Sequence, residues 1–123
     1  MKLMTKELER RFEKIGNQSE IENPVVVAKY FNPVGSATWY ATEYDPQTKI
    51  CYGYVTGMYA DEWGTFSLTE FESVQLPLGM KIERDLYFKE ITFDELIKPK
   101  TQKRESELKD INEHKEQKQD LER

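Results

Sequence analysis

Apolar residues recur along this chain with two different periods, and the change of period marks the predicted elements. Leu8, Phe12 and Ile15 follow one another at spacings of four and three, so they share one face of a helix while the charges between them face water. Thr5 is a suitable N-cap, and Gly16 is a suitable residue to end the helix. We therefore expect an amphipathic helix that covers a sheet.

Segments rich in β-branched and aromatic residues follow, separated by turn sequences that contain proline, glycine, asparagine or aspartate. Four of these segments are expected to be antiparallel strands in sequence order: residues 25–31, 37–44, 50–55 and 63–66. In the second segment, strict alternation places Trp39, Ala41 and Glu43 on one side. Gly53, inside the third, indicates a bulge or a neighbouring group in close approach.

The period changes again at residues 67–70, whose Ser-Leu-Thr-Glu sequence fits a capping box for a short helix. Residues 77–79, Pro-Leu-Gly, end that helix, and residues 81–88 are predicted to form a fifth strand. A second capping pattern at residues 92–95 predicts one or two helical turns that stop at Pro99.

Beyond Lys100 the sequence is almost entirely charged or amide-bearing, so it is typical of a solvated helix or a flexible tail. Leu108, Ile111 and Leu121 are its large apolar residues, which gives thin support for a coiled coil. We predict an α+β fold with one domain over residues 1–100. It has an antiparallel sheet of about five strands, an N-terminal amphipathic helix and a short capped helix after strand four, and residues 101–123 form a charged tail.

Charge is distributed unevenly in this 123-residue chain, whose net charge is −5. Acidic residues greatly outnumber basic residues between positions 41 and 97, and an acidic surface repels a phosphate backbone. The opening segment through Lys14, which contains the predicted helix, has a slight positive excess. Nucleic-acid binding by the body is therefore disfavoured, and binding through the basic N-terminal helix is kept as the weaker alternative.

Cysteine usage and hydropathy favour a cytoplasmic location. The single cysteine, Cys51, rules out an internal disulfide, and no long apolar run follows Met1 as it would in a signal peptide. No segment approaches the length of apolar sequence that a membrane-spanning helix requires. We expect a cytoplasmic protein that does not enter the membrane.

Several motifs resemble the bacterial domain of unknown function family 2958, over about residues 3–96. They are Pro24-Val25-Val26, Ala37-Thr38-Trp39, Thr42-Glu43, Glu62 with Gly64, Ser67-Leu68 with Glu70, Glu72-Ser73-Val74, Pro77-Leu78-Gly79 and Ile82-Glu83-Arg84-Asp85-Leu86-Tyr87-Phe88. The resemblance implies a small single-domain protein of the kind often encoded on conjugative plasmids, integrative elements and phages, with no assigned activity. The chain departs from the family pattern at Tyr52-Gly53-Tyr54, where members often have Phe-Gly-Leu, and at Asp61, where a proline is common.

A polar cluster inside the predicted fifth strand is the main candidate site. If Ile82 and Leu86 face the core, alternation turns Arg84 inward, where a guanidinium requires a carboxylate. We expect a structural bridge from Arg84 to Glu70, Glu72 or Glu43. The same region could instead form a binding pocket or an interface anchor, because Trp and Arg are enriched at binding hot spots. The candidate residues are Trp39, Glu43, Glu62, Trp63, Glu83, Arg84 and Asp85.

Catalytic chemistry has few candidates in this sequence. The single histidine, His114, lies in the charged tail, and Cys51 is expected to be a small buried hydrophobe. No cofactor motif and no zinc-ligand set is present, although loop carboxylates could converge on Mg²⁺ or Ca²⁺. The carboxylates in question are Glu43, Asp45, Asp61 and Glu62.

Two functions follow from these observations. The favoured one is a small acidic non-enzymatic binding protein that acts on nucleic-acid-handling or host-defence machinery through contact with a protein partner. The alternative is a small metal-dependent or carboxylate-based enzyme, which requires Glu43, Glu62, Glu83 and Arg84 to meet in one cleft.

Overall fold

The computed structural model describes residues 1–98. Met1–Thr92 form one compact unit, and a second unit begins at Phe93. Residues 93–98 are helical, as the second capping pattern predicts. The predicted stop at Pro99 and the charged tail over residues 101–123, with its coiled-coil alternative, lie outside the described residues. The predicted α+β class is confirmed.

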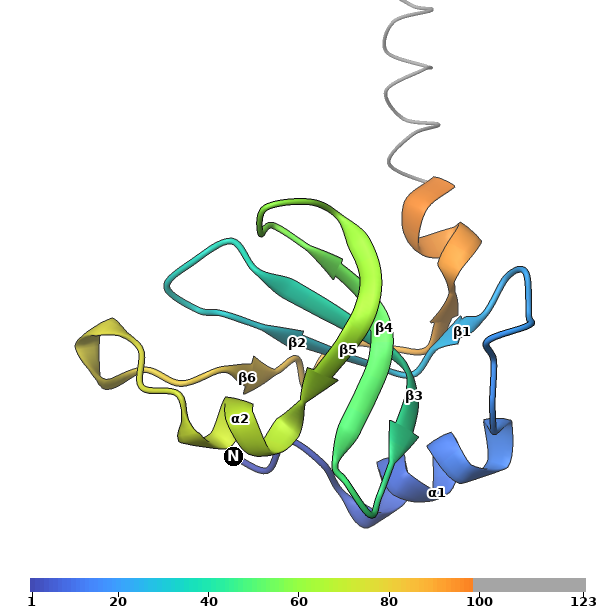
Figure 1. Ribbon diagram of the computed structural model, residues 1–123, viewed down its shortest axis with the longest axis horizontal. Coiled ribbons are helices and arrows are strands. Elements are labelled where there is room, and N and C mark those ends of the chain that lie inside the picture. Colours follow the sequence, from blue (N-terminus) through green and yellow to red (C-terminus); the bar gives the residue numbers. More distant parts are fainter. Residues whose placement is uncertain (99–123) are drawn as a thin grey trace, which may run out of the picture. The chain divides into compact units, whose positions relative to one another are not determined.

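A five-stranded antiparallel sheet forms the centre of Met1–Thr92, as predicted (Figure 1). The strand order is β5-β4-β3-β2-β6, so four consecutive strands form a meander and the last strand joins its β2 edge. The strands are β2 Ala28–Phe31, β3 Thr38–Asp45, β4 Ile50–Thr56, β5 Glu62–Ser67 and β6 Glu83–Arg84.

The first predicted strand, residues 25–31, is divided between two sheets. Its first part, β1 (Val25–Val26), pairs with β7 (Ile91–Thr92) in a separate two-stranded sheet. The amide of Val27 donates to the carbonyl oxygen of Ala41 at 2.9 Å, and β2 then continues beside β3. The segment therefore changes partner at Val27, which local sequence does not indicate.

The prediction of a strand over residues 81–88 is wrong for most of that segment. Only β6 (Glu83–Arg84) pairs with a neighbouring strand, β2. The side chain of Asp85 accepts the amide of Tyr87 at 2.9 Å, which turns the chain out of the extended conformation. Leu86 is consequently 59% exposed, and the expectation that it faces the core is also wrong.

Gly53 explains an irregularity in the middle of the sheet. The register of β3 on β4 shifts between Ala41 and Glu43, which leaves Thr42 as an extra residue. A Cβ atom on Gly53 would lie 1.9 Å from the carbonyl oxygen of Tyr40. The bulge and the close approach that this glycine suggested are thus both present, and the bulge interrupts the alternation that was predicted to group Glu43 with Ala41.

Both helices of Met1–Thr92 begin as their capping residues predict. Thr5 Oγ1 accepts a backbone amide of α1 (Lys6–Ile15) at 3.2 Å, and Gly16 ends this helix with φ 72°. Ser67 Oγ accepts a backbone amide of α2 (Leu68–Ser73), also at 3.2 Å. A 3₁₀ turn, η1 (Pro77–Gly79), follows α2.

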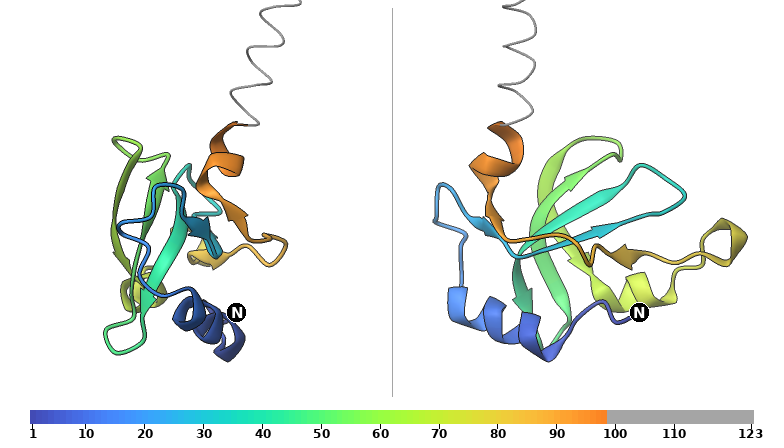
Figure 2. Two further views of the ribbon diagram at one scale, coloured as in Figure 1. Left: turned by 90° about the vertical axis from the view of Figure 1, so that its right-hand side faces the viewer. Right: turned by 180° about the vertical axis from the view of Figure 1, so that it is seen from behind.

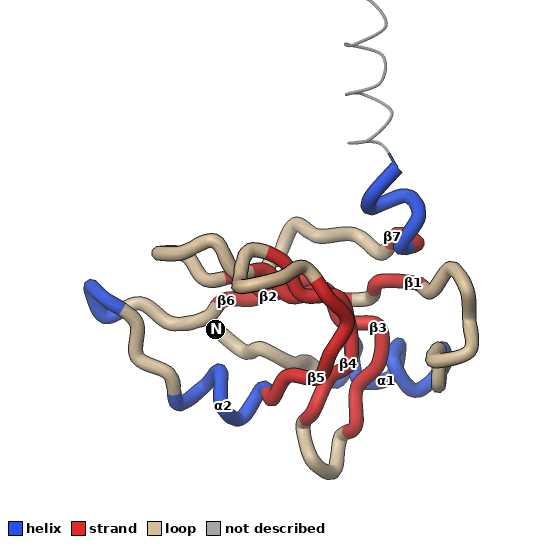
Figure 3. Tube along the Cα trace, turned by 45° about the horizontal axis from the view of Figure 1, so that its top comes forward, coloured by secondary structure: helices blue, strands red, loops and turns tan. Residues whose placement is uncertain are grey.

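The core of Met1–Thr92 lies between the curved sheet and its two helices. Figure 2 shows α1 and α2 at the same end of the sheet, below the strands in both views, and Figure 3 shows the N-terminal segment leading from the region of α2 to α1. Phe12 of α1 packs on Tyr44, with ring centroids 5.8 Å apart. The hydroxyl of fully buried Tyr30 donates to the carbonyl oxygen of Leu3 at 2.7 Å, so the N-terminal segment is part of this core.

Candidate functional site

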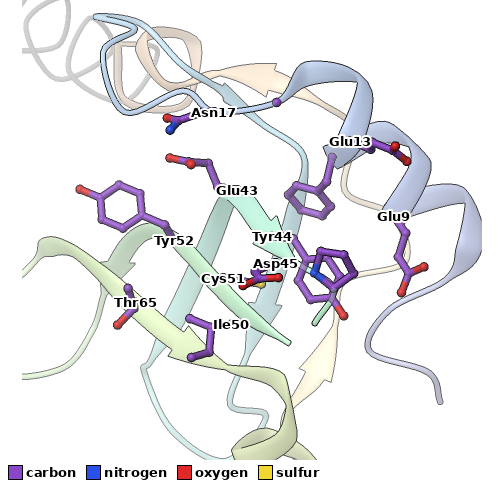
Figure 4. A pocket seen from close by; sticks show the side chains of 13 residues that line it. Glu9, Glu13, Asn17, Glu43, Tyr44, Asp45, Ile50, Cys51, Tyr52 and Thr65 are labelled. Atoms are coloured by element: carbon purple, nitrogen blue, oxygen red, sulfur yellow. The ribbon is translucent and has the colours of Figure 1, made fainter. Parts of the chain in front are cut away.

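An open groove of about 570 Å³ lies between α1 and the β3–β4 hairpin. We call it the acidic groove. Figure 4 shows Glu9 and Glu13 projecting from α1, whereas Glu43 and Tyr52 project from the strands. Its lining residues are Glu9, Phe12, Glu13, Gly16, Asn17, Glu43, Tyr44, Asp45, Pro46, Ile50, Cys51, Tyr52 and Thr65.

The charge of the acidic groove has one sign. Its lining includes four carboxylates and no lysine, arginine or histidine. Glu9 and Glu13 are four residues apart, so they occupy the same flank of α1. Glu43 and Asp45 belong to β3, on the other wall. A cationic ligand in this groove would therefore meet negative charge from both walls.

The floor of the acidic groove is apolar. Phe12 and Tyr44 pack together here, Ile50 is 41% exposed, and Cys51 is fully buried. The pKa of the Tyr44 hydroxyl is raised, first by burial and then by nearby negative groups that include Glu9 and Asp45. Burial and the nearby negative groups both disfavour the charged phenolate, so both raise this pKa.

Short hydrogen bonds hold the strand-side carboxylates in place. Ser19 Oγ donates to Glu43 Oε2 at 3.0 Å, and the amide of Ser19 donates to Asn17 Oδ1 at 2.8 Å. The amide of Gln47 donates to Asp45 Oδ1 at 2.9 Å within the β3–β4 turn. The acids of β3 are thus oriented by the segment after α1 and by the turn.

The carboxylates do not form a metal site. Within residues 1–98 there is no group of three or more His, Cys, Asp or Glu side chains placed to hold a metal ion. Asp61 instead accepts the amide of Gly57 at 3.2 Å in the β4–β5 loop. The convergence of Glu43, Asp45, Asp61 and Glu62 that a Mg²⁺ or Ca²⁺ site requires is therefore not formed.

The residues required for the enzymatic alternative do not meet in one cleft. Strand pairing places Arg84 beside Tyr30 on β2 and Glu62 beside Val55 on β4, so Arg84 and Glu62 lie on opposite edge strands of the sheet. Four strand spacings of about 4.8 Å separate such edges, or roughly 19 Å along the sheet. Glu43 lies apart from both, in the acidic groove.

The remaining candidates have separate environments. Trp39 is 8% exposed and packs on Phe71 with ring centroids 4.6 Å apart, so it is a core residue. Trp63 stacks beside Tyr52 at 5.9 Å. Asp85 pairs with Lys29 at 3.5 Å, and Glu83 pairs with Phe31 in the β6–β2 ladder.

Arg84 does not form the expected carboxylate bridge within the described part of the chain. Its Nε donates to the carbonyl oxygen of Lys2 at 3.1 Å, and the residue is only half buried. Because the N-terminal segment passes beside β6, a backbone oxygen takes the place of Glu70, Glu72 or Glu43. Partial exposure removes the need for a charged partner, since water solvates the rest of the guanidinium.

Two features of this region were missed by sequence reasoning. The four-residue spacing of Glu9 and Glu13 was visible, but only the fold shows that they face β3. Gln18 was treated as part of a polar connection, yet it is 6% exposed and hydrogen-bonded to the strands. No local signal distinguishes it from an exposed glutamine.

No helix within residues 1–98 has both the length and the apolar character needed to cross a membrane.

The comparisons with known proteins give a family and no activity. No curated protein and no solved structure matches the chain. A family model described as "Protein of unknown function (DUF2958)" matches residues 3–96. Since that match covers most of the 123 residues, the chain belongs to the DUF2958 family, as its motifs suggested.

Proposed function

We propose that this protein is a non-enzymatic binding protein whose acidic groove takes a cationic segment of a protein partner. The observation that supports the proposal is the arrangement of carboxylates on both walls of a groove with an apolar floor. Their spacing does not suit a single metal ion. It suits several cationic groups distributed along a chain.

The apolar floor gives the groove a preference for lysine and arginine side chains over small cations. Their methylene stems can pack on the partly exposed Tyr44 and Ile50 while the charged ends reach the carboxylates of the rim. The Tyr44 ring also offers a surface to a guanidinium. Electrostatic attraction mainly accelerates encounter, whereas the floor provides the apolar burial that slows dissociation.

The partners that best fit this chemistry are cytoplasmic proteins whose basic surfaces handle nucleic acid, including host-defence effectors. Carboxylates on an acidic protein can occupy positions that phosphates otherwise take. The chain's net charge of −5 and the single charge sign of the acidic groove support this choice. A role in modulating such machinery on behalf of a mobile genetic element agrees with the setting that the family resemblance implies.

Affinity capture with a matched pair of double variants tests the proposal. Tagged full-length protein is incubated with lysate of its native host at several salt concentrations, and bound proteins are identified by mass spectrometry. We expect a basic protein whose recovery decreases as salt increases. The variant Glu9→Gln with Glu13→Gln should lose this partner, because it removes two groove charges without changing either β strand.

The control variant carries Glu20→Gln and Glu22→Gln. It removes the same number of charges from exposed positions outside the groove and should retain the partner. Equal loss from both variants would show that net charge, not the groove, governs binding. Recovery that is indifferent to salt and to all four substitutions would contradict the proposal.

A further inference from the structure

A second groove, of about 600 Å³, lies along the opposite flank of α1. We call it the basic groove. It combines residues of the helix with Arg84 of β6 and with Glu90, which precedes β7. Its lining residues are Thr5, Glu7, Leu8, Arg10, Arg11, Lys14, Arg84 and Glu90.

The basic groove is positive within an acidic protein. Four cationic side chains line it against two carboxylates. One cation and one carboxylate neutralise each other, because Arg11 Nε lies 2.7 Å from Glu90 Oε2. Glu7 is then the single lining carboxylate that remains to balance Arg10, Lys14 and Arg84.

Helix stability accounts for only part of this cluster. Glu7 lies three residues before Arg10, a spacing at which opposite charges stabilise a helix slightly. Arg10 and Lys14 are four residues apart on α1, a spacing at which like charges destabilise a helix slightly. Lys14 does complement the helix dipole in the last turn, but Arg10 and Arg84 have no such role. A bound anion would offset the repulsion among all three cations.

Arg84 is oriented for anion recognition. The hydrogen bond from its Nε to the carbonyl oxygen of Lys2 fixes one edge of the guanidinium. Its two terminal nitrogens remain as donors on a side chain that lines the groove. A guanidinium held in this way has lost little further freedom when it binds the paired oxygens of a phosphate.

We propose that the basic groove binds the phosphate group of a small phosphorylated molecule of about nucleotide size. Arg84 supplies the paired donors, Lys14 and Arg10 supply further positive charge, and Leu8 supplies apolar surface for the organic part. The groove volume lies within the range of about 300–1,000 Å³ that is usual for such ligands.

A long nucleic-acid strand fits the same charges less well. Glu9 and Glu13 of the acidic groove lie on the other flank of the same helix, where they would repel a backbone extending past α1. A compact phosphorylated molecule avoids that repulsion. The test therefore compares the two sources of phosphate directly.

Calorimetric titration of the full-length chain at low salt provides the measurement, with inorganic pyrophosphate and a short single-stranded oligonucleotide as probes. We expect saturable binding of pyrophosphate. Arg84→Gln and Lys14→Gln should each weaken it by about tenfold or more, the effect of losing one charge-assisted hydrogen bond. Arg84→Lys should give an intermediate loss, because it keeps the charge but not the paired donors.

The matched control is Lys6→Gln, which removes a positive charge from an exposed position on α1 outside the groove. It should change the dissociation constant by less than about twofold, because Lys6 does not line the groove and so cannot donate a hydrogen bond to the phosphate. If Arg84→Gln fails to fold by circular dichroism, the exposed Lys14→Gln variant still decides the outcome. Equal effects of Lys6→Gln and Lys14→Gln, no pyrophosphate binding, or binding of the oligonucleotide alone would each overturn the proposal.

Discussion

Gln18 donates from its side-chain amide to the carbonyl oxygen of Thr42 at 2.7 Å, across 24 positions of sequence. The same amide nitrogen donates to the carbonyl oxygen of Val25 at 2.9 Å, and the amide oxygen accepts from Val25 N at 2.7 Å. One buried side chain therefore joins the segment after α1 to β1 and to the bulge in β3. It satisfies backbone groups that strand pairing leaves free at this point.

Replacing Gln18 with leucine should destabilise the fold strongly. Three hydrogen bonds would be lost. The backbone amide and carbonyl oxygen of Val25 and the carbonyl oxygen of Thr42 would each lose the hydrogen bond that Gln18 provides. We expect the free energy of unfolding to decrease by about 2–4 kcal/mol, measured by urea denaturation. The control Gln75→Leu makes the same chemical change at an exposed position and should stay within about 0.5 kcal/mol of wild type. Similar losses from both substitutions would argue against this role of Gln18.

Gly53 and Gly64 face each other across β4 and β5 and provide a matched pair of substitutions. Gly53→Ala would place a Cβ atom 1.9 Å from the Tyr40 carbonyl oxygen, so β3 and β4 would have to separate. We expect a loss of about 3 kcal/mol or more, or failure to fold. Gly64→Ala meets nothing within 4 Å and should be close to neutral or mildly stabilising. Thermal unfolding of the two variants side by side measures the difference.

The elements with short-range signals were predictable from sequence. Thr5 and Ser67 act as N-caps, and capping depends on only a few neighbouring residues. Gly53 inside a strand signalled a close approach, but only the fold shows that the approaching group is the carbonyl of Tyr40 on β3. The division of residues 25–31 between two sheets was not predictable. It depends on β7, which lies far away in sequence and provides the competing partner.

The candidate site was less accessible to sequence reasoning than the fold. Alternation correctly placed Arg84 within a strand, but its partner is the backbone of Lys2, and backbone oxygens carry no sequence signature. The acidic groove needs the bulge at Thr42, which decides where Glu43 projects. Both features depend on which distant segments meet.

Stability should decrease in alkaline solution partly because of Cys51. Burial raises the pKa of its thiol from 9.0 to about 12, so the folded state keeps the neutral thiol while the unfolded chain can ionise. The resulting contribution to stability is fully present below about pH 9 and is lost as pH rises towards 12. Burial also raises the pKa of Tyr30 and Tyr44, which adds a similar loss above their ordinary value of 10.0.

Urea denaturation between pH 8 and 10 can isolate the cysteine contribution. Wild type should lose at most about 1.4 kcal/mol per pH unit from this group. Cys51→Ala should be less stable at pH 8, because it creates a small cavity, yet its stability should decline less steeply as pH rises. Parallel pH profiles for the two proteins would exclude Cys51 as the source.

Leu78 has a left-handed backbone conformation, with φ 64° and ψ 23°, and its side chain is 91% exposed. This conformation is unfavourable for leucine and well tolerated by asparagine. Leu78→Asn should therefore stabilise the protein by about 0.5–1 kcal/mol, which calorimetry would show as a higher melting temperature. The control Leu86→Asn, at another exposed leucine outside that conformation, should have little effect. An unchanged or lower melting temperature for Leu78→Asn would contradict the strain argument.

The rotation of α1 about its own axis determines which side chains it buries and also which charged side chains line the two grooves. Leu8 and Phe12 anchor the helix on the sheet with Glu9 and Glu13 on one flank and Arg11 and Lys14 on the other. Turning the helix by one residue, about 100°, would carry each charged row out of its groove. Conservative changes to these two anchors that rotate the helix would therefore disturb both proposed binding sites at once, without altering the isoelectric point of the protein.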